Sequence, residues 1–310
     1  MGGCAGRALN AFNSFTDTIE TVFCGLVGDC WYVDATTSDE EVDVVDTAAA
    51  RCERFTELAK MIPVRDLPTD EVVGQDSTEQ ITVDVARLPG EVSLVTKILR
   101  EFVELYPNVG YNQGGDWCLL AILSAVGDSY DTALRVFAKW AVTTAWVTVR
   151  TIGGENEALF KAVWYTVNVL DEQTPSVVQW LLDDKIMNLR ECTGNMFFKT
   201  LTSFIFLRPM ATLCSTEGFD ERILHVIIEK TLEYGEDGPA VSLWVITCLL
   251  NMAFQNAKST AGCSGGSEAM AHRMTEAAES AKTFQELENS APLPLAEFIR
   301  RFRTDGKLAD

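Results

Sequence analysis

The sequence predicts an all-α fold, and two observations indicate it. Apolar residues recur at helical spacing along most of the chain, and Val92, Val95, Ile98, Leu99 and Phe102 are a clear example, spaced i, i+3, i+6, i+7 and i+10. The predicted helices also begin near Asp, Ser or Pro, which cap a helix or fit its first turn. No repeat of about 33 to 45 residues is visible, so a regular solenoid is not expected.

The first 80 residues combine two predicted helices with two acidic irregular segments. Apolar residues at roughly helical spacing predict an amphipathic helix over residues 8–28. Residues 34–46 carry six acids and no base, so a solvated linker is expected there. A helix over residues 46–61 follows, and a second acid-rich segment, from 63 to about 80, contains Pro and Gly and is predicted to be irregular.

The rest of the chain is predicted to be helical almost throughout, with one loop over residues 259–267 that is rich in Gly and Ser. The pattern therefore predicts three parts: an N-terminal extension (1–45), one large helical domain (46–303) and a short tail (304–310). The predicted helices of the domain's main part cover residues 91–106, 116–126, 128–149, 155–170, 176–185, about 219–234, 240–257, 268–289 and 295–303.

Composition excludes several classes of function. The formal net charge is −20, so a nucleic-acid partner is not expected, because the phosphate backbone would be repelled. The nine cysteines form no C-x-x-C pair and several sit in apolar runs, which predicts reduced thiols in a core. The two histidines, His225 and His272, lie far apart, so neither a zinc site nor a His-dependent hydrolase is expected. His225 and the seven tryptophans are interpreted as core packing.

The ends of the chain and its apolar runs bear on localisation. No apolar run reaches the ~20 residues of a membrane span, and no signal peptide is visible, so a cytoplasmic protein is predicted. Met1-Gly2-Gly3-Cys4 resembles an acylation signal, with Gly2 available for myristoylation and Cys4 for palmitoylation. The sixth residue is Gly6 rather than Ser or Thr, so an unmodified N-terminus is the alternative. Stable anchoring would need both lipids.

Two short motifs flank the predicted helix over 91–106. The first motif is Ile81-x-x-Asp84-x-x-Arg87, and the second motif is Tyr111-x-Gln113-Gly114. Each alone is weak, but their order is specific. Together they resemble the signatures of the TBC-domain family of GTPase-activating proteins for Rab-type GTPases, and the resemblance covers roughly residues 46–303.

This resemblance implies a GTPase activator rather than an independent hydrolase. Arg87 would be an arginine finger that stabilises the charge of the transferring phosphoryl group, and Gln113 would supply the amide that orients the attacking water. Asp84 would orient Arg87 by a charge-assisted hydrogen bond, with Tyr111 and Gly114 as supporting residues. The chain would bind no cofactor of its own, because Mg²⁺ and GTP belong to the partner GTPase. No Gly-rich phosphate loop occurs, which agrees with this division.

Other interpretations stay open at this point. Arg87 and Asp84 could be an ordinary surface pair, and the second motif could be an inter-helix turn. The whole chain could be an inactive TBC-like binding module or a helical adaptor. The adaptor is favoured by Leu224 and His225, which replace a Trp and an Asp of the family pattern. Gly115 and Asp116 are further departures, at positions where Met and Asn are usual.

Overall fold

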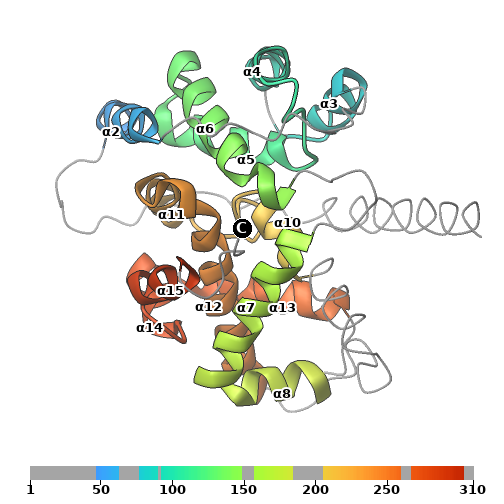
Figure 1. Cartoon of the computed structure of the whole chain (residues 1–310), viewed down its shortest axis with the longest axis vertical. Helices are drawn as coiled ribbons and strands as arrows, with labels where there is room; N and C mark the ends of the chain where they lie inside the picture. Colours follow the sequence, from blue (N-terminus) through green and yellow to red (C-terminus); the bar gives the residue numbers. More distant parts are fainter. Residues whose placement is uncertain are drawn as a thin grey trace, which may run out of the picture. The chain divides into compact units, whose positions relative to one another are not determined.

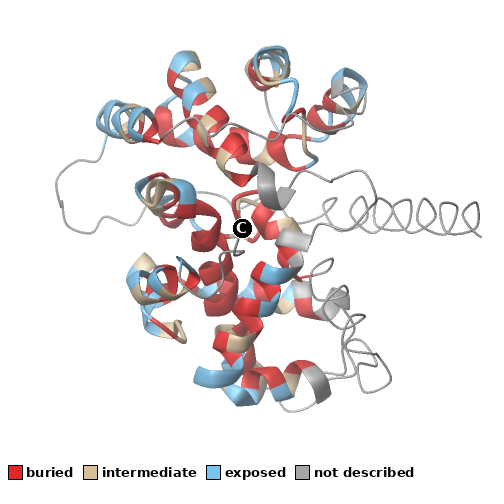
Figure 2. Cartoon of the chain, in the orientation of Figure 1, coloured by how far each residue is buried: buried red, intermediate tan, exposed pale blue. Residues whose placement is uncertain are grey.

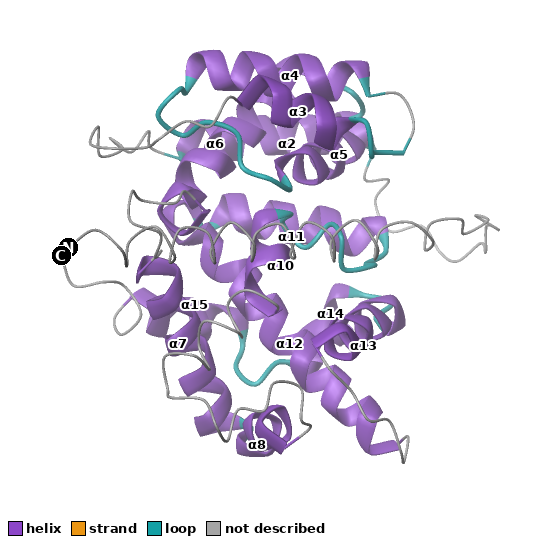
Figure 3. Ribbon diagram, turned by 90° about the vertical axis from the view of Figure 1, so that its right-hand side faces the viewer, coloured by secondary structure: helices purple, strands orange, loops and turns teal. Residues whose placement is uncertain are grey.

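The computed structural model describes residues 47–62, 77–89, 92–148, 157–183, 205–259 and 267–303. These residues form thirteen α-helices and one short 3-10 helix, and no strand occurs in this part of the chain (Figure 3). The predicted all-α fold is confirmed. The chain divides into two units, Met1–Val45 and Asp46–Asp310, and every described residue belongs to the second. The predicted helix 8–28, the acidic linker and the acylation residues Gly2 and Cys4 lie outside the described residues.

Five helices build a first hydrophobic core, drawn in the upper part of Figure 1. The helix over residues 93–105 packs into this core through its apolar stripe, because Val95, Ile98, Leu99 and Phe102 are all buried. The helix over residues 115–126 is apolar on most sides and lies at the centre of the core, in contact with the other four helices. The five helices are α2 (Ala48–Met61), α3 (Ser77–Val85), α4 (Ser93–Leu105), α5 (Gly115–Val126) and α6 (Tyr130–Thr148).

A second core surrounds Trp244, whose side chain is fully buried and whose Nε1 donates to the Leu293 carbonyl at 2.8 Å. Trp244 lies on α12 (Gly238–Ser259), which is buried along most of its length (Figure 2). The helices packed against α12 in this core are α7 (Glu157–Gln173), α8 (Pro175–Asp183), α10 (Leu207–Ala211), α13 (Ser267–Ser280), α14 (Phe284–Ser290) and α15 (Leu295–Arg301).

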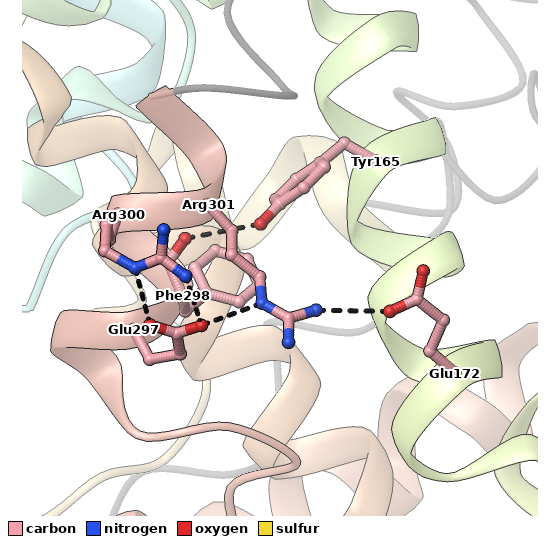
Figure 4. Close-up of polar contacts among 6 residues, drawn as sticks. All are labelled: Tyr165, Glu172, Glu297, Phe298, Arg300 and Arg301. Carbon is pink, nitrogen blue, oxygen red and sulfur yellow. Dashed lines mark hydrogen bonds and ion pairs between the residues drawn. The ribbon is translucent and has the colours of Figure 1, made fainter.

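Polar contacts fasten α15 to α7 at the edge of the second core (Figure 4). Arg301 donates from Nη1 to Glu172 at 3.1 Å and from Nε to Glu297 at 2.9 Å. The Tyr165 hydroxyl donates to the Phe298 carbonyl at 3.3 Å, and its ring packs against Phe298. The Arg301–Glu172 pair, the Tyr165 hydrogen bond and aromatic packing thus hold α15 against α7, while the Arg301–Glu297 pair lies within α15.

One helix, α11 (Glu221–Glu233), belongs to both cores. Ile223 and Ile227 pack into the second core, whereas Leu224, Ile228 and Leu232 pack into the first. Each set is spaced by four residues, and the two sets are offset by one, so they form neighbouring stripes on the same helix. α11 therefore lies between the two groups of helices (Figure 3), and the 3-10 helix Gly235–Asp237 follows it.

Three sequence predictions about elements are wrong. Residues 77–80, predicted to be irregular, are the first turn of α3. The single helix predicted over 268–289 is two helices, because the chain breaks at 281–283, where the Thr283 hydroxyl caps α14 by accepting from the Glu286 amide at 3.2 Å. Trp164, predicted to pack in the core, is 52% exposed on α7. Among the described tryptophans, Trp140 and Trp244 are buried as expected.

The prediction that no segment is long enough to cross a membrane also needs correction. The helical stretch Gly235–Ala257 has 23 residues and a mean hydropathy of 1.3, which suffices for a span by length and composition. However, 72% of its apolar window is buried against the chain's own helices. A core helix of a soluble protein passes the same test, so this stretch is weak evidence for a span.

Candidate functional site

The first motif ends helix α3 with a buried carboxylate and an exposed arginine. Asp84 is only 3% exposed, and its two carboxylate oxygens accept from the Gln80 amide at 2.9 and 3.0 Å. Arg87 lies in the turn after α3, where its amide donates to the Asp84 carbonyl at 3.0 Å. Its side chain is 46% exposed and reaches Asp84 only at 3.4 Å. Leu88, buried next to it, fixes this turn to the core.

The second motif forms the turn that leads into α5. Gln113 is exposed, and the turn closes when the Gly115 amide donates to the Asn112 carbonyl at 3.0 Å. Gly114 caps α5 with φ of 95°, a left-handed conformation that favours glycine. A Cβ at Gly114 would lie 3.0 Å from the Thr212 Cγ2 just after α10. Glycine is therefore required here for its backbone angle and for the close approach of Thr212.

The Tyr111 hydroxyl joins the two motifs. It lies 3.0 Å from Asp84 Oδ2 and 3.1 Å from Asp116 Oδ1, which brings together residues 27 positions apart in the sequence. Burial, and then the negative charges of Asp116 and Asp84, raise the pKa of Tyr111 well above its ordinary value. Tyr111 is therefore a neutral hydrogen-bonding group at any ordinary pH.

Asp116, in the first turn of α5, is 2% exposed and is the second carboxyl at this junction. Burial, followed by the negative charge of Asp84, raises the pKa of Asp116 to about 6. Two buried acids, one partly buried tyrosine and one partly buried glutamine thus form a polar cluster, which we call the Tyr111 cluster: Gln80, Asp84, Tyr111 and Asp116. Arg87 and Gln113 lie at its exposed border.

This arrangement gives two exposed polar side chains a rigid buried support. Arg87 is not needed to satisfy Asp84, because Gln80 and Tyr111 approach that carboxylate more closely. A guanidinium with one long, half-exposed contact contributes little to stability and is available to an incoming anion. Chemically, the site offers one cationic fork and one amide to a ligand that approaches from outside.

The structure unites most of the residues singled out in the sequence and adds three that were missed. Asp84, Arg87, Tyr111, Gln113 and Gly114 all lie at this junction. The missed residues are Gln80, Asp116 as a partner of Tyr111, and Thr212. The i, i+4 spacing of Gln80 and Asp84 was a usable signal, which the irregular assignment of residues 63–80 concealed. The contact of Thr212 is tertiary and has no local signal.

The other candidate residues are part of the packing. His225 is buried, as expected for a core histidine, and its Nε2 lies 3.1 Å from the Ser124 hydroxyl on α5. Four cysteines are described, all as free thiols, and Cys118, Cys214 and Cys248 are buried. Within the described ranges no group of three or more His, Cys, Asp and Glu side chains is placed to hold a metal ion.

Replacing Gly114 tests how tightly this turn is defined. Gly114→Ala should lower the free energy of unfolding by about 2 to 3 kcal/mol, because it adds a left-handed backbone penalty and a clash with Thr212. Gly235→Ala is the matched control, since Gly235 has φ of 54° and open space around its Cβ position. It should lose only about 1 kcal/mol. Urea unfolding of both variants measures the difference, and equal losses would contradict a steric role for Thr212.

No known family model matches this chain, and neither a curated protein nor a solved structure matches it. The resemblance to the TBC-domain family therefore depends on the residues of the two motifs and their immediate surroundings. The described geometry establishes an all-α protein in which those two motifs meet at a partly buried tyrosine.

Proposed function

We propose that this protein accelerates GTP hydrolysis by a small Rab-type GTPase, with Arg87 and Gln113 acting on the partner's bound nucleotide. One observation carries the proposal: the Tyr111 hydroxyl contacts the buried Asp84, so that the two motifs share the Tyr111 cluster. Chance motifs would have no reason to meet across 27 residues of chain.

The chemistry of GTP hydrolysis explains why these two side chains suffice. Negative charge spreads over the γ-phosphate oxygens and the leaving oxygen, and a planar guanidinium stabilises it from outside. A glutamine amide can orient the attacking water. The partner contributes GTP and Mg²⁺, so the chain needs neither a nucleotide pocket nor a cofactor. An acidic chain can still take part, because the catalytic cation is a single exposed guanidinium.

A catalytic role, rather than that of a binding module, is supported by the buried carboxylate that lies behind the exposed Arg87. A merely adhesive surface would not require Asp84 to be buried and held by Gln80 and Tyr111 immediately behind an exposed arginine. Such a buried support restricts the motion of the side chains it carries, which is what positioning for phosphoryl transfer requires. Lipidation at Gly2 and Cys4 would place this activity at a cytoplasmic membrane surface.

A screen of GTP hydrolysis tests the proposal. The full chain is incubated with each member of a panel of GTP-loaded Rab-type GTPases, and released phosphate is measured under single-turnover conditions. At least one GTPase should hydrolyse GTP faster than it does alone. Binding without acceleration across the panel would favour the inactive module, and absence of both would favour the helical adaptor.

A further inference from the structure

We infer that Asp116 is a positioning residue that holds Tyr111, and through it both motifs, only while its own carboxyl is protonated. The role in holding the Tyr111 cluster concerns this chain alone. Its consequence for Arg87 and Gln113 rests on the proposed function.

The geometry of the hydroxyl leads to this inference. A phenol has a single proton, and Tyr111 Oη lies within hydrogen-bond distance of two carboxyl groups, at 3.0 and 3.1 Å. If both carboxyls are ionised, one of these contacts brings two oxygen lone pairs together inside the protein. A proton on Asp116 removes the conflict, because Asp116 then donates to Tyr111, and Tyr111 donates to Asp84.

The neighbours determine which of the two acids takes the proton. Asp84 accepts from the Gln80 amide at both oxygens and lies 3.4 Å from the Arg87 guanidinium, so donors and a positive charge already surround it. Asp116 has Tyr111 as its side-chain partner and backbone amides at the start of α5 as its other donors. Those amides and the positive helix end favour its anion, but burial and the charge of Asp84 outweigh them and raise the pKa of Asp116 to about 6.

The titratable groups around Asp116 come from every element packed at this junction. Helix α3 contributes Asp84, the turn after it contributes Arg87, and the turn before α5 contributes Tyr111. Helix α5 contributes Cys118, whose pKa is raised well above its ordinary value by burial and by the charge of Asp116. Cys214, from the segment after α10, acts on Cys118 in turn, and burial also raises its pKa. Both thiols therefore stay neutral, and Asp116 is the group that changes charge near pH 6.

The direction of the pH dependence follows from the raised pKa. An acid whose pKa is higher in the folded than in the unfolded state binds more protons when folded, so its stabilising contribution is complete below about pH 4. That contribution is lost as the pH rises through about 6. The Tyr111 cluster is accordingly tighter in mildly acidic than in alkaline solution.

Replacement of Asp116 by asparagine tests this prediction. Asp116→Asn supplies a permanent amide donor to Tyr111, so its melting temperature at pH 7.5 should exceed that of the wild type by about 3 to 6 °C. Below about pH 4 the two proteins should melt together, because the stabilising contribution of the Asp116 proton is complete there. Asp131→Asn is the matched control, because Asp131 is an exposed acid in the first turn of α6. It should show no such pH-dependent gain, and an equal or lower melting temperature of Asp116→Asn at pH 7.5 would overturn the inference.

Two further measurements test the inference, and the first of them needs only the wild-type protein. Carboxyl ¹³C resonances of the wild-type protein should include one aspartate that titrates near pH 6, and an absence of any aspartate titrating above pH 5 would overturn it. Tyr111→Phe should abolish the gain from Asp116→Asn, since the shared hydroxyl is gone. If Tyr111→Phe leaves the gain in melting temperature from Asp116→Asn intact, Asp116 does not act through Tyr111.

Measuring the stimulated rate of GTP hydrolysis at two pH values separates this inference from the proposed function. With a responsive GTPase, the ratio of the Asp116→Asn rate to the wild-type rate should rise between pH 5.5 and 7.5, while Asp131→Asn keeps a constant ratio. A pH-dependent stability gain without any GTPase response would sustain the titration of Asp116 and count against the proposed function. A constant activity ratio with a responsive GTPase would contradict a positioning role.

Discussion

Arg87→Ala is expected to lower the stimulated rate of GTP hydrolysis by roughly 10³ to 10⁵-fold, the range for an arginine supplied in trans. The variant should fold normally, because the Arg87 side chain is half exposed and Asp84 keeps its closer partners Gln80 and Tyr111. Single-turnover phosphate release with the responsive GTPase measures the rate, and the melting temperature checks the fold.

Two control variants make the result specific. Arg100→Ala removes an exposed arginine from α4 and should leave the rate unchanged. Arg87→Lys keeps the charge but should recover little activity, because an ammonium cannot reproduce the planar fork of a guanidinium. Full activity in Arg87→Ala would exclude the arginine-finger mechanism, and equal losses in Arg87→Ala and Arg100→Ala would indicate a general effect of surface charge.

The second large effect concerns the source of the glutamine amide. If Gln113 orients the attacking water, the wild-type protein should still accelerate hydrolysis by a GTPase whose own catalytic glutamine has been replaced by alanine. Gln113→Ala should lose most of its activity on the normal GTPase, by about 10²-fold or more. With both glutamines replaced, hydrolysis should fall to the level without activator.

The control for this experiment is Gln179→Ala, which removes an exposed glutamine from α8, in the other group of helices. It should act like the wild type on both forms of the GTPase. Loss of acceleration when only the GTPase glutamine is replaced, with binding retained, would remove Gln113 from its assigned role and leave Arg87 as the single finger. Affinity is measured in parallel to separate weaker binding from slower chemistry.

The helices could be predicted because their signals are local. The stripe from Val95 to Phe102 is buried as a periodic pattern requires, and the predicted limits of α5 agree with the structure to within one residue. The wrong predictions concern residues whose secondary structure or burial is determined by a tertiary contact. Residues 77–80 are polar and follow a segment with Pro63, Pro68 and Gly74, yet they are helical, because Gln80 contacts Asp84 and Ile81 enters the core. Trp164 lies on a helix whose opposite face is buried, and periodicity alone did not place it outside.

The site was predictable as a list of residues but not as a cluster. The motif spacing identified Asp84, Arg87, Tyr111 and Gln113, because each motif is local. No local rule indicates that the Tyr111 hydroxyl contacts Asp84, or that Asp116 competes with Asp84 for the hydroxyl proton of Tyr111. That competition depends on burial, which arises from the tertiary packing of α5 against its neighbouring helices, α3 among them.

The shared helix α11 has a consequence for cooperativity. Because its two stripes belong to different cores, neither group of helices can open without stripping apolar side chains of α11 from their packing. Both groups should therefore melt in a single transition, with the α11 amides among the slowest to exchange with deuterated water. A GTPase docked on the first group would then slow exchange in the second as well, because both share the same global opening reaction.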